Sequence, residues 1–174
     1  MSKRIFMESR EEMEQLLQEQ TVGYLGVVDG GVPYVVPLNY AYADGKIRFH
    51  CALTGQKLDA LRSNPFVCFT VARQTGVVRD HEGGPPCHVD SDSVICFGRA
   101  RVLDDLSERA AALNAFNRRY RPSVPDLAPE RVAACTAVEI AITEMTGRRE
   151  RDRQRTYWRT IFSAPDPVRP IAEN

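Results

Sequence analysis

The fold is decided by one stretch that passes from a strand through a turn into a helix: Phe49-His50-Cys51-Ala52-Leu53-Thr54-Gly55-Gln56-Lys57. Before the turn, residues 46–50 alternate polar and apolar side chains, which predicts a half-buried strand. After the turn, leucines recur at helical spacing, and Thr54 is placed to cap the helix. Ser63-Asn64-Pro65 then ends the helix, because a residue before proline disfavours helical geometry.

Two further strands are expected upstream of this turn. Residues 21–28 are rich in β-branched and aromatic side chains and are followed by Asp29-Gly30-Gly31, a strong hairpin signal. Residues 32–42 form the next expected strand, in which Pro33 and Pro37 indicate an edge or a bulge because proline has no N–H to donate. With the strand described above, these segments predict an antiparallel meander.

Downstream of the turn the sequence predicts three more strands. Residues 66–72 are almost continuously apolar, which indicates a central, buried strand, and residues 93–103 and 136–144 complete the set. The segment 74–92 is polar and rich in glycine and proline, so we expect a loop there. Six strands at short spacing predict a mainly β protein, an antiparallel barrel that is closed or nearly closed.

Helices are expected between these strands. Ser9-Arg10-Glu11-Glu12 has the spacing of a capping box, which predicts a short N-terminal helix. Asp105 and Glu108 repeat that spacing, and residues 126–135 are the site of a further short helix. The helix after Asp105 carries apolar residues near helical spacing: Ala110, Leu113, Phe116 and Tyr120.

The composition is that of one soluble domain. The chain has 174 residues, of which 23 are Lys or Arg and 23 are Asp or Glu, so no net charge attracts nucleic acid or an anionic membrane. Its N-terminus has no apolar signal core, and no apolar run approaches the roughly 20 residues of a membrane span. The five cysteines lack tight pairing motifs, which indicates reduced thiols in a cytoplasmic protein.

The order of these segments resembles the pyridoxamine 5′-phosphate oxidase-like superfamily and, within it, the nitroimidazole-resistance (Nim) group. The resemblance extends over about residues 10 to 148 and depends on a series of segments more than on any single motif. The segments that carry it are Val32–Tyr40, Asp44–Ile47, Phe49-His50, Lys57-Leu58-Asp59, Asn64–Phe69, Ser93–Ala100 and Glu144–Gly147.

The resemblance implies a six-stranded split β-barrel that forms a homodimer, with one flavin mononucleotide (FMN) in each of two clefts at the subunit interface. Residues 1–147 would form this FMN-binding domain. Residues 148–174, which are rich in arginine, would form a tail docked on the barrel or on the partner subunit. The acidic residues mixed with these arginines argue against a nucleic-acid site.

The start of the helix after the turn is the expected phosphate site. A helix N-terminus offers unpaired N–H groups and partial positive charge. Thr54 adds a hydroxyl, Gly55 permits close backbone approach, and Lys57 supplies a full charge. Gln56 stands where the family often has an arginine, so the clamp has one charge fewer. The alternative is a capped helix with a solvated lysine.

The strand at 32–42 is expected to face the flavin ring. The resemblance implies that the backbone of Pro37, Leu38, Asn39 and Tyr40 lies along the polar edge of the ring. Alternatively, Asn39 serves a bulge and Tyr40 packs as an ordinary strand residue.

His50 and Cys51, at the end of the next strand, complete the expected cofactor site. His50 matches a Nim-group histidine near the flavin and is the candidate catalytic residue, as a proton donor. The alternative for His50 is a structural histidine.

The loop before residue 93 is not expected to bind a metal. His81, Cys87 and His88 lie in it, but four ligands at the spacing of a zinc site are absent. Residues 87–92 also replace an aromatic and hydroxyl-rich stretch of the Nim group. Because this region reaches the partner's flavin in the family, the replacement leaves the substrate and the cofactor open.

The expected function is an FMN-dependent oxidoreductase that reduces a small aromatic or nitro compound with electrons from a nicotinamide donor. The alternative is a flavin- or heme-binding protein that stores, senses or shuttles its cofactor. His50, His81 or His88 would then be the axial ligand of the heme. Deazaflavin is another cofactor of the family, and a barrel that has lost its cofactor is a third possibility.

Overall fold

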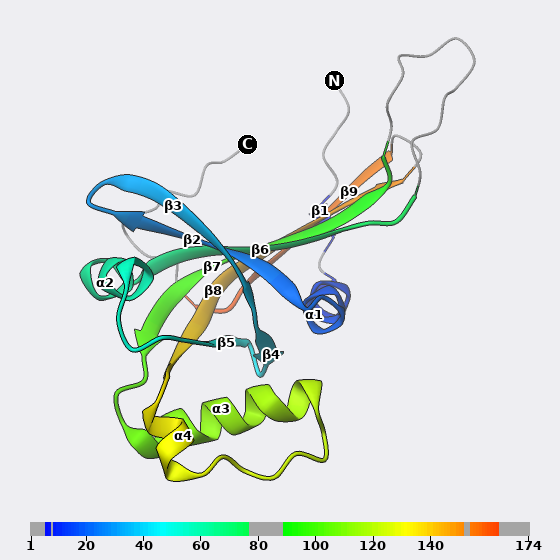
Figure 1. Cartoon of the computed structure of the whole chain (residues 1–174). Helices are drawn as coiled ribbons and strands as arrows, with labels where there is room; N and C mark the ends of the chain where they lie inside the picture. Colours follow the sequence, from blue (N-terminus) through cyan, green and yellow to red (C-terminus); the bar gives the residue numbers. More distant parts are fainter. Residues whose placement is uncertain (1–5, 8, 77–88, 152–153, 164–174) are drawn as a thin grey trace.

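The computed structural model describes residues 6–7, 9–76, 89–151 and 154–163. A strongly curled sheet with helices packed against it makes up most of this part of the chain (Figure 1). The elements, in chain order, are β1 (Phe6–Met7), α1 (Arg10–Glu19), β2 (Val22–Asp29), β3 (Val32–Asn39), β4 (Ala41–Ala43), β5 (Lys46–Cys51), α2 (Gln56–Ser63), β6 (Phe66–Gln74), β7 (Ser91–Val102), α3 (Leu106–Tyr120), α4 (Pro129–Ala133), β8 (Thr136–Arg151) and β9 (Gln154–Ile161).

The sheet closes on itself through one bent strand. Its order is β1-β9-β8-β7-β6-β2-β3, with β5 joined through β8 and β4 paired to β5. All pairings are antiparallel except that of β1 with β9. β3 pairs with β2, and β4 pairs with β5, although only Tyr40 separates β3 from β4. The predicted mainly β split barrel is therefore confirmed.

The bend between β3 and β4 was not expected from the sequence, which predicted one strand over 32–42. Tyr40 is fully buried, and its hydroxyl donates a hydrogen bond to the main-chain oxygen of Leu17, 2.7 Å away. Its ring meets that of Phe69 edge-on, with centroids 4.8 Å apart. Because the tyrosine is held inside the barrel between α1 and β6, the chain changes direction there.

The positions of the strands follow the sequence signals closely. β3 lies at an edge of the sheet, as Pro33 and Pro37 predicted. β6 lies between β2 and β7, which confirms the prediction of a central strand over 66–72. Position 23 of β2 requires a glycine, because a Cβ atom there would lie 2.1 Å from the ring of Phe69 on β6.

The chain after residue 147 continues the sheet. β8 runs on to Arg151, beyond the predicted end at residue 144, and β9 pairs with it in antiparallel register. Two of the arginines assigned to a tail, Arg149 and Arg151, donate to Asp92 of β7, as does Arg73 of β6. The Asp92 side chain is almost fully buried, so its three arginine partners tie β6, β7 and β8 together.

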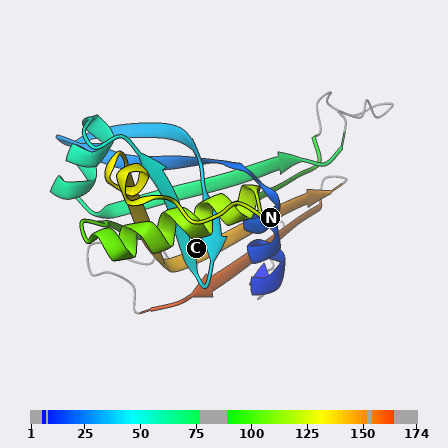
Figure 2. The same cartoon turned by 60° about the horizontal axis from the view of Figure 1, so that its bottom comes forward.

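The helices cover the barrel and its open end. α2 packs on β2 and β7, whereas α3 packs on β5 and β8, and Figure 2 shows α3 lying across the sheet at β5. The predicted cap of α3 is present, since the Asp105 carboxylate accepts from the main-chain N–H of Glu108 at 2.9 Å. α1 forms as predicted, but the side chain of Ser9 makes no capping hydrogen bond. The expected short helix within 126–135 is α4.

Candidate functional site

The turn into α2 is built around a glycine. Thr54 was expected to cap the helix, but the N-cap residue is Gly55, so that prediction is wrong. Gly55 has a φ of +133°, a backbone conformation that residues with a side chain rarely adopt. Its main-chain oxygen accepts from the N–H groups of Leu58 and Asp59. A Cβ atom at Gly55 would meet no atom within 4 Å, so the turn is open on its outer side.

Lys57 stands in the first turn of α2 without an acidic partner among the described residues. Lys57 is half-buried as a residue, and its ammonium nitrogen lies 5.5 Å from the centroid of the Phe49 ring. The first N–H groups of a helix also have no partner within the helix, and they carry partial positive charge. The turn therefore presents backbone donors and one full positive charge on an open surface.

The side chain of Gln56 points to the neighbouring hairpin. Its amide donates to the carboxylate of Asp29, at the end of β2, with 2.8 Å between nitrogen and oxygen. This bond fixes the start of α2 to the hairpin that joins β2 and β3. It also means that the amide group of Gln56 is already used within the protein.

His50 and Cys51 are the last two residues of β5, next to Lys57. His50 is an exposed residue, but its imidazole is partly shielded from water. This shielding lowers the pKa of His50 below its ordinary value, and the positive charge of Lys57 lowers the pKa further. Burial raises the pKa of the Cys51 thiol, against the opposing effect of Lys57. At neutral pH the end of β5 therefore offers a neutral imidazole and an uncharged thiol beside an ammonium group.

The other predicted site residues lie at the far end of β3. Pro37 and Asn39 are exposed and Leu38 is half-buried, and the Asn39 amide donates to the main-chain oxygen of Thr21 at 2.9 Å. Tyr40 is a core residue, and burial raises its pKa far above the ordinary value. Its side chain is therefore committed to packing, as the alternative interpretation of that residue proposed.

The start of α2 and Asn39 are separated along β3. The bond between Gln56 and Asp29 places the helix start near one end of this strand, where Asp29 faces Val32, whereas Asn39 at the other end faces Val22. Seven residues of strand span about 23 Å at about 3.3 Å per residue. A ligand that reaches from the start of α2 to Asn39 along β3 must therefore be elongated, whereas His50 lies nearer to Tyr40, because Arg48 of β5 faces Ala41.

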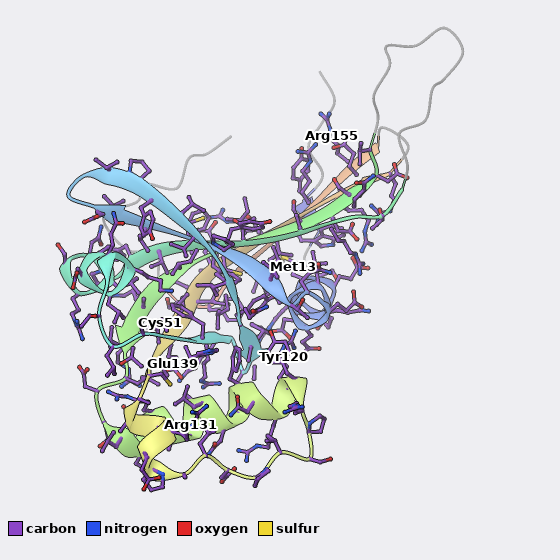
Figure 3. All side chains as sticks on the ribbon, in the orientation of Figure 1. Met13, Cys51, Tyr120, Arg131, Glu139 and Arg155 are labelled. Atoms are coloured by element: carbon purple, nitrogen blue, oxygen red, sulfur yellow. The ribbon has the colours of Figure 1, made fainter. Side chains whose placement is uncertain are left out.

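Sequence reasoning missed two residues of α3 that contact the site. The ring of Phe116 lies against that of His50, and the hydroxyl of Tyr120 donates to the main-chain oxygen of Tyr40. In Figure 3, the labels of Glu139 and Tyr120 lie between β5 and α3, and that of Cys51 lies on the other side of β5. The helical spacing of Phe116 and Tyr120 was the available signal, but it does not indicate which strand the helix covers.

The described residues contain no metal site, and the cavity under α1 is separate from the candidate site. No three His, Cys, Asp or Glu side chains of the described part lie close enough to hold a metal ion. His81, Cys87 and His88 lie outside the described residues. A cavity under α1, lined by residues that include Met13, Asp92 and Trp158, shares no residue with the candidate site. No helix of the described ranges is long and apolar enough to cross a membrane.

The sequence of this chain is similar to a known protein family and to a curated relative. A family model described as pyridoxamine 5′-phosphate oxidase matches residues 9–149. A curated relative, an uncharacterised protein of Rhizobium meliloti, is 35% identical over 65 residues, and the match spans 37% of this chain and 42% of that protein.

Solved structures extend the comparison over most of the chain. A candidate 5-nitroimidazole antibiotic resistance protein from Bacteroides thetaiotaomicron has 26% identity and a TM-score of 0.73 over 83% of this chain and 86% of that one. A FAD-binding protein from Mesorhizobium loti has 27% identity and a TM-score of 0.61 over 82% and 96%. The FAD and heme binding protein from Mycobacterium smegmatis shares the fold at 20% identity, with a TM-score of 0.70 over 92% and 75%. These matches confirm the resemblance to the superfamily and its Nim group.

Proposed function

The chain belongs to the pyridoxamine 5′-phosphate oxidase family, and we propose that it binds FMN and uses it to reduce a small aromatic or nitro compound. The observation that carries the proposal is the open turn at Gly55, with Lys57 beside His50 and without an acidic partner among the residues that the structure describes. The similarity to a FAD-binding protein at 27% identity supports a flavin as the ligand.

The residues of the turn fit the phosphate of a flavin. Gly55 leaves room for a close approach, the first turn of α2 supplies backbone donors, and Lys57 supplies the charge. His50 adds a neutral imidazole that can donate or accept a hydrogen bond. Because Gln56 donates to Asp29 and brings no charge, Lys57 is the cation on which this clamp depends.

The elongated site suits a ligand with a phosphate at one end and a ring at the other. In the proposed complex, the phosphate lies at the start of α2, and the ring extends along β3 towards Pro37, Leu38 and Asn39. FMN, when bound, supplies hydride and electron transfer between a nicotinamide donor and the substrate. The backbone at the end of β3 orients the ring, and His50 holds or delivers a proton at its imidazole nitrogen.

We also propose that a second copy of the chain covers the outer face of the sheet and completes each flavin site. Four apolar side chains of β2 and β3 are exposed by 40% or more and, by the register of the two strands, share one face: Val22, Tyr24, Val28 and Val35. Contiguous exposed apolar surface of this kind is typical of protein–protein interfaces. The open strand edge at β3 is blunted by prolines, so we expect face-to-face packing.

Spectroscopy of the purified protein tests the proposed function. We expect added FMN to be retained after gel filtration, with the absorption bands of a bound flavin, and to be bleached by a nicotinamide nucleotide without oxygen. Bound flavin should then be reoxidised by a nitroaromatic compound. A protein that retains no FMN overturns the proposal. If the protein binds FAD more tightly than FMN, the proposal of FMN as the ligand is wrong and FAD takes its place.

The second candidate function is a flavin- or heme-binding protein without rapid turnover. It is supported by the shared fold with the FAD and heme binding protein of Mycobacterium smegmatis. The same purified sample separates the two candidates. An intense Soret band after heme addition, or a bound flavin that no nicotinamide nucleotide bleaches, favours storage or sensing.

A further inference from the structure

Phe116 is the side chain of α3 that contacts the candidate catalytic histidine. The ring centroids of His50 and Phe116 lie 4.8 Å apart, and the rings are inclined by 75°, an edge-to-face arrangement. Phe116 is only 8% exposed, although His50 is an exposed residue. In the sheet, His50 lies opposite Ala137 of β8. The residue opposite His50 in the sheet is therefore small, and the Phe116 ring supplies an aromatic contact from α3.

The same helix is fixed to the bend at Tyr40 one turn later. The Tyr120 ring packs on that of Phe116, with centroids 5.0 Å apart. Its hydroxyl donates to the main-chain oxygen of Tyr40 at 2.7 Å. Arg119 donates to the main-chain oxygens of Gln18 and Gln20, at the end of α1. α3 is thus held against β5 at Phe116 and against the bend between β3 and β4 at Tyr120.

The charges near His50 come from elements other than α3. Lys57 of α2 lies near enough to act on the imidazole. Arg48, two residues earlier on the same side of β5, is paired with Glu139 of β8 at 2.8 Å. The contact that α3 makes with His50 is the uncharged ring of Phe116. Lys57 and Phe116 therefore act differently on the histidine, one by charge and the other by excluding water and restricting the ring.

We propose that Phe116 is a positioning residue, which holds the imidazole of His50 beside Lys57 in the orientation that the flavin site requires. Through Tyr120, the same helix also fixes the bend at Tyr40, next to the end of β3. The catalytic consequence rests on the proposed function, but the contact between the two rings does not. Nothing in this role requires Phe116 to touch the ligand.

The test compares three substitutions in α3. Phe116→Leu removes the aromatic ring but keeps an apolar side chain, Phe116→Tyr keeps the ring, and Leu113→Ala removes apolar packing from the same helix in the core cluster that also contains Leu103 and Val132. NMR titration of the ligand-free proteins gives the pKa of His50, assigned with His50→Gln. FMN titrations of the same proteins give the dissociation constants.

We expect the pKa of His50 to rise in Phe116→Leu, because burial lowers it in the native protein, and to stay near the native value in Phe116→Tyr and Leu113→Ala. We expect FMN affinity to fall about threefold to tenfold in Phe116→Leu only, as for the loss of one aromatic pair. An unchanged His50 pKa in Phe116→Leu, or an equal rise in Leu113→Ala, overturns the proposal. If native protein binds no FMN but only Phe116→Leu shifts the pKa, the positioning role stands and the proposed function fails.

Discussion

Asp92→Ala is expected to lower the free energy of unfolding by about 2–4 kcal/mol. The Asp92 side chain is 5% exposed and accepts five hydrogen bonds of 2.9 to 3.2 Å from three arginines, one on β6 and two on β8. Removing one partner of a buried ion pair costs roughly 3–5 kcal/mol. The lower range applies here because the three arginines are about one-third exposed, so water satisfies part of what they lose.

Urea unfolding followed by tryptophan fluorescence measures this loss of free energy of unfolding with a reporter near Asp92. Trp158 is the only tryptophan of the sequence, and the guanidinium carbon of Arg149 lies 4.9 Å from the centroid of its ring. For a chain of this length, the predicted loss also lowers the melting temperature by roughly 5–15 °C. The control is Asp126→Ala, which removes an acid that is 66% exposed and paired with Arg118. A loss below about 1 kcal/mol, or one no larger than in the control, would refute the reasoning.

The contribution of Asp92 to the free energy of unfolding should depend on pH. Burial raises the pKa of Asp92, but the hydrogen bonds from the arginines outweigh it, so the folded pKa lies below the ordinary value of 3.8. A depressed pKa stabilises the protein above the unfolded pKa, and this contribution is lost as the pH falls through the folded pKa. The difference in stability between native protein and Asp92→Asn should therefore be constant near neutrality and shrink below about pH 4.

Two further substitutions test the packing of the barrel and its outer face. Gly23→Ala should lower the stability by about 1–3 kcal/mol in the same unfolding assay, because its Cβ atom would overlap the buried ring of Phe69; an unchanged midpoint would contradict the packing. Val35→Lys should convert the proposed dimer to a monomer in light scattering, whereas Val32→Lys, equally exposed on the other face of β3, should not; identical masses for both variants would contradict the proposed interface.

Local signals predicted the parts of the fold that depend on neighbouring residues. Pro33 and Pro37 placed β3 at an edge because a missing N–H is a property of the residue itself. The carboxylate of Asp105 caps α3 for the same kind of local reason. The cap of α2 was assigned wrongly, since Thr54 and Gly55 are both good cap residues and the open turn required a positive φ.

Long-range contacts explain what the sequence could not predict. The arginines after residue 147 were interpreted as a tail docked on the barrel or on the partner subunit and not as part of the sheet, because their acidic partner Asp92 lies more than 50 residues earlier. The same separation hid the contact between His50 and Phe116. Tyr40 follows the apolar pattern of a strand, and the strand bends there because of contacts with Leu17 and Phe69 on other elements.

Calorimetric titration with FMN and with riboflavin tests the central claim most directly, because the two ligands differ only in the phosphate. We predict that the native protein binds FMN more tightly and that Lys57→Ala weakens FMN binding by about 1.5–3 kcal/mol, or about 10- to 150-fold. Riboflavin affinity should stay the same in Lys57→Ala, and Arg62→Ala, which removes a charge from the other end of α2, should leave both affinities within about twofold. Equal affinity for the two ligands in the native protein, or an equal loss for both in Lys57→Ala, would contradict a phosphate site at the start of α2.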